Sequence, residues 1–231
     1  MFDISPTEWT AILLSLRVAT VATLVATPLG IAVGWLLARR EFWGKALLDA
    51  VIHLPLVLPP VVTGYLLLLT FGRRGAVGAW LAEHLGLVFA FRWTGAALAC
   101  GIMSFPLLVR PIRLSIEAVD RRLEQAAGTL GAAPWQVFLT VTLPLAVSGV
   151  LAGMVLGFAK ALGEFGATIT FVSNIPGETQ TISSAIYALI QTPDGDTAAL
   201  RLVVVSVVLA TAALIASEWF SRRALLRLHG N

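Results

Sequence analysis

The sequence predicts an all-α, polytopic membrane protein with about five transmembrane helices. Of its 231 residues, 58% are hydrophobic and only 13% are charged, and the mean hydropathy is +0.87. Soluble domains carry about 25% charged residues. The apolar residues also come in runs of about 20, which is the length of a helix that crosses a bilayer. Residues 1–231 are therefore expected to form a single membrane domain, with almost no room for a soluble one.

Five apolar runs give the predicted spans. They cover about residues 7–38, 46–71, 94–114, 137–158 and 198–220. The first holds Pro28 in its middle, and proline should bend a helix or loosen its hydrogen bonding. A connector at 72–93 contains a weakly amphipathic piece, 80–87. The stretch 171–196 is mixed and polar, and its middle, 181–190, suits a short re-entrant or surface helix but is too short to span.

Three prolines interrupt the second span within six positions, in the run HLPLVLPPVVTG at 53–64. A helix surrounded by lipid does not leave that many backbone carbonyls unpaired. Broken backbone is tolerated where it is buried in protein or lines a watery cavity. Pro59, Pro60, Val61 and Thr63 are therefore candidates for the wall or gate of a path through the protein. A plain proline kink in a packed helix is the alternative.

Small residues and two charges mark the fourth span. Gly149, Gly153 and Gly157 recur every four residues on one helix face, where they would let another span approach closely. Lys160 and Glu164 follow, four residues apart, at a spacing that allows them to pair. Charges at the membrane are costly and usually face a cavity or one another. Glu164 is thus either a wall residue of the path or half of a structural ion pair.

A polar insert, DRRLEQAAGTLGAAPWQVFLTVTLP at 120–144, separates the third and fourth spans. Its apolar residues recur at helical spacing, and Gly131 and Pro134 end a first helix and turn the chain. Ala126, Ala127 and Gly131 are small, whereas helices that rest on lipid carry bulky apolar side chains. We therefore expect a short helix that fits a groove on a soluble partner. An amphipathic helix resting on lipid is the alternative.

The basic residues predict the orientation. Five spans put the two ends of the chain on opposite sides of the membrane. Ten Lys and Arg residues lie at or beyond the span ends on one side, at 39–45, 110–122 and 222–227, and four lie on the other. Positively charged loops stay in the cytoplasm. The N-terminus is therefore expected outside, and the C-terminus and the insert at 120–144 in the cytoplasm.

The residue inventory argues against an enzyme. No nucleotide-binding G-x-x-x-x-G-K-[ST] run is present. His53, His84 and His229 are scattered, with no metal-ligand or Ser/His/Asp cluster beside them. The single cysteine, Cys100, lies in an apolar run and is interpreted as core filler. The net charge of +3 bears on orientation and not on nucleic acid. No catalytic residue, metal site or cofactor is expected.

The insert resembles the cytoplasmic loop of bacterial ABC importer permeases. That family carries E-A-A, three residues, G, nine residues and I-x-L-P. Here QAA at 125–127 is followed at the same spacings by Gly131 and by VTLP at 141–144. Gln125 replaces the family's Glu and Val141 its Ile, and Glu124 lies one position too early for the acidic place. The resemblance implies that the coupling contacts with an ATPase involve Glu124, Gln125, Ala126, Ala127, Gly131, Leu143 and Pro144.

Other runs extend the resemblance over nearly the whole chain. HLPLVLPPVVTGYLLL, GRRG, MSFPLLVR, LGEFGATITFVSNIPGET and ALIQTP are similar to those of the molybdate importer permeases of Gram-negative bacteria. The resemblance implies a type I ABC importer permease, in the bacterial inner membrane, with its N-terminus in the periplasm. It also implies a homodimer of five-span subunits that carries two cytoplasmic ATPase subunits. A periplasmic binding protein would deliver molybdate or tungstate.

The resemblance also names gate residues. In such permeases the Glu of a run like GEFGA lies at the cytoplasmic end of the path or gate, which here points to Glu164, Phe165 and Thr168. The topology drawn from the basic residues instead puts Glu164 toward the outer side, because the fourth span leaves the cytoplasm near residue 137.

The predicted function is the permease subunit of an ATP-driven importer. Burying an unpaired dianion in hydrocarbon is costly, and no arginine cluster within the spans would make a tight anion site. We therefore expect a low-affinity, water-filled path that opens alternately to each side, with specificity residing in the binding protein. The alternatives are a permease for another oxyanion such as sulfate, or an ATPase-independent secondary transporter. A secondary transporter would show inverted repeats and membrane-embedded carboxylates, and neither is clear here.

Overall fold

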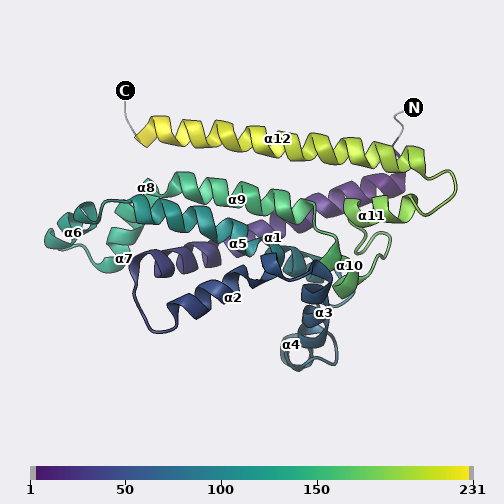
Figure 1. Cartoon of the computed structure of the whole chain (residues 1–231), viewed down its shortest axis with the longest axis horizontal. Coiled ribbons are helices and arrows are strands. Elements are labelled where there is room, and N and C mark those ends of the chain that lie inside the picture. The colour runs from purple at the N-terminus through teal and green to yellow at the C-terminus, as the bar shows by residue number, and fades with distance from the viewer. Residues whose placement is uncertain (1–3, 229–231) are drawn as a thin grey trace.

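Four long helices lie side by side and form the body of the protein (Figure 1). The computed structural model describes residues 4–228, with side chains up to residue 216, and every regular element in this range is helical. The long helices are α1 (Pro6–Arg39), α5 (Trp93–Ala118), α9 (Val147–Leu162) and α12 (Asp196–Leu228). The side chains of Arg222, Arg223 and Arg227, which entered the orientation argument, lie outside the described residues.

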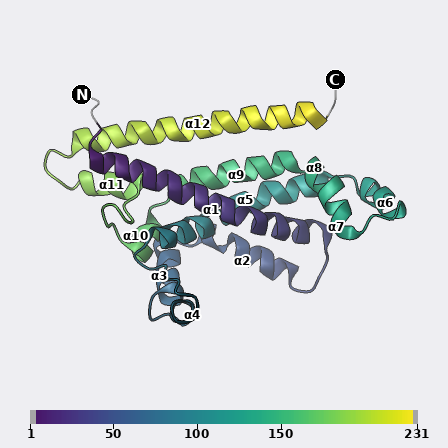
Figure 2. The ribbon, with the colours of Figure 1, turned by 180° about the vertical axis from the view of Figure 1, so that it is seen from behind.

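Short helices connect the long ones. α2 (Lys45–Val57), α3 (Pro60–Phe71) and α4 (Ala76–Leu85) lie between α1 and α5. Between α5 and α9 come α6 (Arg121–Thr129), α7 (Pro134–Val137), the π-helix η1 (Phe138–Thr142) and α8 (Leu143–Leu145). α10 (Gly166–Val172) and α11 (Ile182–Leu189) join α9 to α12. Figures 1 and 2 place α6 and α11 at opposite ends of the body, called here the α6 end and the α11 end.

α5 is the centre of the packing. In its apolar window 61% of residues are buried inside the protein, against 11% for α12. Cys100, Leu108 and Ile112 of α5 are completely buried where α5 meets α1 and α9. The thiol of Cys100 donates to the carbonyl oxygen of Ala161 at 3.4 Å, so this residue packs in the core as expected. α12 lies at the edge and leaves most of its apolar surface for lipid.

Two of the glycines spaced along α9 let it approach α5. A Cβ on Gly153 would lie 2.5 Å from the carbonyl oxygen of Leu108, and one on Gly149 would lie 2.6 Å from that of Pro111. Any side chain at these positions would push the two helices apart. The prediction that this glycine face packs against another span is confirmed.

Two predicted spans are bent. α1, α5 and α12 are long and apolar enough to cross a membrane by themselves, and up to five spans result if each bent pair is one span. The second predicted span consists of α2 and α3, which meet at 114°. The fourth predicted span is bent as well: Pro134–Leu145 and α9 meet at 70°, and its long straight part begins at Val147. Prolines lack the N–H that continues a helix, and both bends lie close to prolines.

α1 continues as one helix through Pro28, so the proline does not interrupt it. Its first turn is fixed by a capping box between Ser5 and Glu8. Glu8 also lies 2.9 Å from the guanidinium of Arg201 on α12. This buried carboxylate therefore joins the first turn of α1 to the first turns of α12, two segments at opposite ends of the sequence.

The shorter segments agree with the sequence. The amphipathic piece 80–87 falls mostly in α4, and the segment 181–190 forms α11. The amide of Ile182 at the start of α11 donates to the Ser15 hydroxyl on α1 at 2.7 Å. In the loop after α1, Lys45 donates to Glu41 at 2.6 Å, and this hydrogen bond holds the pKa of Glu41 below its ordinary value.

Candidate functional site

The two segments proposed as gates, far apart in the sequence, lie against each other. α3 packs on α10, as Figures 1 and 2 show. A Cβ on Gly166 would lie 2.6 Å from the Cβ of Pro60, and one on Gly64 would lie 2.5 Å from the carbonyl oxygen of Ala167. Two glycines therefore let these short helices touch through their backbones. The proline break and the GEFGA run form one site.

Glu164 is buried at the corner between α9 and α10. Its side chain is 1% exposed, and one carboxylate oxygen accepts a hydrogen bond from the Lys160 ammonium at 2.6 Å. The other oxygen accepts from the amide of Ala167, in the first turn of α10, at 3.0 Å. The expected pairing of Lys160 with Glu164 is confirmed. A negative charge beside a helix N-terminus is favourable, so the carboxylate stabilises the corner while both its oxygens are satisfied.

The other gate candidates fall into two groups. Pro59, Pro60 and Val61 are exposed, whereas Thr63 and Thr168 are buried. The Thr168 hydroxyl donates to the carbonyl oxygen of Phe165 at 2.9 Å. The Phe165 ring itself lies 4.9 Å from that of Tyr187 on α11. Thr63 is 6% exposed, and its buried hydroxyl has no hydrogen-bond partner among the described residues.

This gate site lies at the α11 end of the body. α9 is 16 residues long, which is about 24 Å at 1.5 Å per residue, and it carries the chain away from α6 before Glu164 is reached (Figure 1). The sequence leaves the depth of Glu164 open between the cytoplasmic end and the outer side, and in the structure Glu164 lies at the end opposite to the coupling insert. The placement agrees with the topology drawn from the basic residues.

The insert stands out from the body at the α6 end. Asp120 caps α6 by accepting a hydrogen bond from the amide of Arg122 at 2.9 Å, and no residue of α6 is buried. Gly131 follows with a φ of +91°, a left-handed conformation that favours glycine. α7 then starts at Pro134, where its missing N–H costs nothing. The short helix and the turn expected from the sequence are both present.

Glu124 ties the insert to the first helix. Its Oε1 lies 3.1 Å from Nη2 of Arg39 and accepts a hydrogen bond from the Thr142 hydroxyl at 2.6 Å. Arg39 Nη2 also donates to the carbonyl oxygen of Val119 at 2.9 Å. The Arg39 side chain is only 8% exposed, so this contact is shielded from water. Arg39, Glu124 and Thr142, called here the Arg39 cluster, join the last turn of α1, α6 and the π-helix η1.

The outer face of the insert makes no such contacts. Gln125 and Ala126 are exposed, and Ala127 is half-buried. Beside them lie three large apolar side chains with high exposed fractions: Leu123 at 50%, Leu130 at 89% and Trp135 at 65%. Leu143 and Pro144 are half-buried where the chain rejoins the body. The motif thus divides, with Glu124 turned toward α1 and the small and apolar residues presented outward.

The sequence reasoning missed residues that complete both sites. It treats Arg39 as a loop cation and Thr142 as a spacer within the motif. Their contacts with Glu124 join positions 85 and 18 residues apart, and a single sequence carries no signal for such pairs. Gly64 was also missed, because its role depends on the backbone of α10.

Lys160→Met should destabilise the protein more than Glu164→Gln. The first change leaves a buried carboxylate without its cation, which costs about 3–5 kcal/mol. The second leaves Lys160, whose side chain is 29% exposed and can reach water. Thermal unfolding of the purified protein in detergent measures the difference, and the double variant should recover part of the loss. Equal losses from the two single variants would contradict this asymmetry.

Residues 26–225 match the family described as "Binding-protein-dependent transport system inner membrane component". The chain is 61% identical over 215 residues to the molybdenum transport system permease protein ModB of Escherichia coli (strain K12), covering 93% of this chain and 94% of that protein. It is 58% identical over 216 residues to ModB of Haemophilus influenzae, covering 94% of each.

In structure, the chain resembles a crystal structure of a bacterial ABC transporter involved in the import of the acidic polysaccharide alginate. The TM-score is 0.74 at 19% identity, covering 95% of this chain and 80% of that one. This is a likeness of fold, and it agrees with the sequence match over most of the chain. The chain therefore belongs to the family of binding-protein-dependent transport system inner membrane components.

Proposed function

We propose that this protein is the transmembrane permease of an ATP-driven importer of molybdate, with tungstate as a second substrate. The observation that carries the proposal is its likeness, along nearly the whole chain, to two molybdenum transport permeases. ATP hydrolysis belongs to a partner subunit, so the chain itself is not an enzyme and needs no cofactor. A periplasmic protein delivers the oxyanion and provides most of the specificity.

The insert is the docking surface for the ATPase in this proposal. Its exposed Leu130 and Trp135 flank a turn made of small residues. Short helices with apolar anchors bind grooves on partner proteins. Because Glu124 is engaged with Arg39 and Gln125 is neutral, the grip on the ATPase depends on shape more than on a carboxylate at the motif's first position.

A second copy of the chain completes the path. α3 projects sideways from the body with α4 at its tip (Figures 1 and 2). The break at Pro59 and Pro60 is exposed in the single chain. Broken backbone at membrane depth must be covered by protein or face water. Two copies that face each other across these breaks would supply both the cover and a watery path between them.

The path binds its substrate weakly. Arg17 lies over the Trp93 ring and Arg201 pairs with Glu8, so neither belongs to a cluster of free cations within the spans. A strong anion site would lower the cost of burying the dianion but would also trap it. The contact of α3 with α10 is the gate, and the ATPases open and close it by moving the insert.

The α6 end is cytoplasmic and the α11 end periplasmic in this proposal. Arg39, Arg40, Arg121 and Arg122 gather near the α6 end, where the positive-inside rule puts them in the cytoplasm. α1 starts at the α11 end and α12 finishes at the α6 end (Figure 1), which fits an outer N-terminus and an inner C-terminus in the bacterial inner membrane.

The complete transporter should import molybdate only with ATP and both partners present. The permease is reconstituted in vesicles with its ATPase and binding protein, and uptake of labelled molybdate is measured with unlabelled competitors. Unlabelled tungstate should compete and sulfate should not. Uptake without the ATPase would point to a secondary transporter, and stronger competition by sulfate would assign another oxyanion.

Gly131→Val should release the ATPase while the permease stays inserted. A Cβ at this position meets no atom within 4 Å, so the effect arises from the φ of +91° and the altered turn. Gly131→Asn should keep more of the attachment, since asparagine tolerates this conformation. Gly128→Ala, also in open space, is the matched control. The measurement is the amount of ATPase that co-purifies, and normal attachment of Gly131→Val would refute the assignment of the turn.

Arg39→Gln should lower the amount of molybdate imported per ATP hydrolysed. The Arg39 cluster is the contact through which movement of α6 reaches α1. Coupling free energies of this kind correspond to about fivefold or more. Glu124→Gln should have the same effect, and the double variant should add little to either. Arg40→Gln, an exposed neighbouring cation, is the control. An unchanged ratio in both cluster variants would show that α1 is not driven through this contact.

A further inference from the structure

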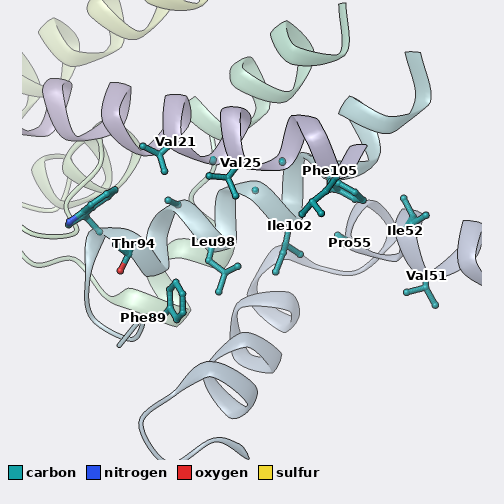
Figure 3. Close-up of a pocket in the computed structure, with 16 residues that line it drawn as sticks. Val21, Val25, Val51, Ile52, Pro55, Phe89, Thr94, Leu98, Ile102 and Phe105 are labelled. Carbon is teal, nitrogen blue, oxygen red and sulfur yellow. The ribbon is translucent and has the colours of Figure 1, made fainter. Parts of the chain in front are cut away.

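An apolar groove lies between α1, α2 and α5, as Figure 3 shows, and the transport mechanism above makes no use of it. Its volume is about 590 Å³. Val25, Leu98, Ile102 and Phe105 contribute to its walls, and the only polar groups of the lining side chains are the Thr94 hydroxyl and the indole N–H of Trp93. The groove is therefore built to hold hydrocarbon.

The length of the groove matches one leaflet of a bilayer. Along α5 its lining residues run from Trp93 to Phe105, which is about 18 Å at 1.5 Å per residue. The hydrocarbon core of a bilayer is about 30 Å thick, so the acyl chains of one leaflet cover about 15 Å. A single extended acyl chain fits along this distance.

A cation lies at the α11 end of the groove. The guanidinium carbon of Arg17 is 3.7 Å from the centre of the Trp93 ring, and Trp93 lines the groove. Arg17 is exposed, and the ion pairs among the described residues all involve other cations. A charged side chain on a membrane helix is costly unless its head reaches the interface. Stacking on the ring leaves the edge N–H groups of the guanidinium free.

We propose that the groove is a binding site for one phospholipid of the leaflet at the α11 end. The phosphate binds the fork of Arg17, whose planar N–H groups match phosphate oxygens, and one acyl chain lies along α5 from Trp93 toward Phe105. Charge complementarity at Arg17 and the one-leaflet length favour a lipid over a helix from a second copy of the chain.

Two variants test the two halves of this site. Arg17→Gln removes the phosphate ligand. Gly101→Leu fills the groove, and a Cβ on Gly101 comes no closer than 3.8 Å to its neighbours, so the backbone can stay in place. The full-length protein is equilibrated with palmitoyl-oleoyl phosphatidylglycerol in detergent and then examined by native mass spectrometry. Arg17→Gln should weaken retention of the lipid about tenfold, the size expected when a charge-assisted contact is lost. Gly101→Leu should also weaken it, because its side chain occupies the place of the acyl chain.

Matched controls separate this site from general lipid binding. Arg73→Gln removes an exposed cation in the loop after α3, and Leu24→Phe adds bulk to α1 at an exposed position outside the groove. Both should retain the lipid as the unchanged protein does. Palmitoyl-oleoyl glycerol, which has the same chains without phosphate, should be lost on purification. Its equal retention would overturn the role of Arg17.

Photo-crosslinking identifies the occupant directly. A benzoylphenylalanine placed at Leu98, on the groove wall, is activated in native membranes. Phospholipid adducts should form there, and Arg17→Gln should reduce them. A cross-linked dimer instead of a lipid adduct would show that a second copy fills the groove. Equal lipid retention by Arg17→Gln, Gly101→Leu and the unchanged protein would also overturn the proposal.

Discussion

The structure depends on one constraint: backbone amides and carbonyls at a helix break inside a membrane need partners. At the α9–α10 corner, the Glu164 carboxylate accepts from the first turn of α10 and is itself neutralised by Lys160. At the α2–α3 break the described residues offer no such group, and Pro59 and Pro60 are exposed. The backbone at the α9–α10 corner thus finds a side-chain partner within the chain, whereas the backbone at the α2–α3 break finds none among the described residues. The first break is called closed here and the second open. The open one meets the closed one at Gly166, which makes this contact the natural place for a gate.

Three little-exposed carboxylates fix how segments of the body meet in a chain with few charges. Glu8 joins α1 to α12, Glu124 joins α1 to α6 and η1, and Glu164 fixes the corner after α9. Ion pairs of this kind pay a desolvation cost and add little net stability, but removing one partner is strongly destabilising. Their effect is to fix geometry. Glu124 shows the consequence best, because a charge committed to Arg39 leaves the outer face of the insert to apolar and small side chains.

The two functional regions are separated by about the length of α9, roughly 24 Å by its rise per residue. Movement at α6 therefore reaches the gate only through packed helices. α9 follows α6 in the chain after the short helices α7, η1 and α8. It is packed against α5 through Gly149 and Gly153, and α1 is held at the α6 end by the Arg39 cluster. Close backbone contacts transmit a displacement from one helix to the next, because no flexible side chains lie between the backbones to absorb it. The apolar groove is lined by α1 and α5, which belong to this packed set of helices, and by α2.

The sequence by itself determined the helical membrane class, the positions of most spans, the glycine face of α9, the helix and turn at Gly131 and the pairing of Lys160 with Glu164. Each of these depends on local composition or on helical spacing, which one chain displays. Only the tertiary structure decided that α3 touches α10, that Glu124 faces Arg39, and that the fourth predicted span bends before Val147. These features depend on contacts between residues distant in the chain and on how a proline bend is directed. Local sequence patterns determine neither these contacts nor the direction of a bend, because both depend on which segments pack against each other in the folded chain.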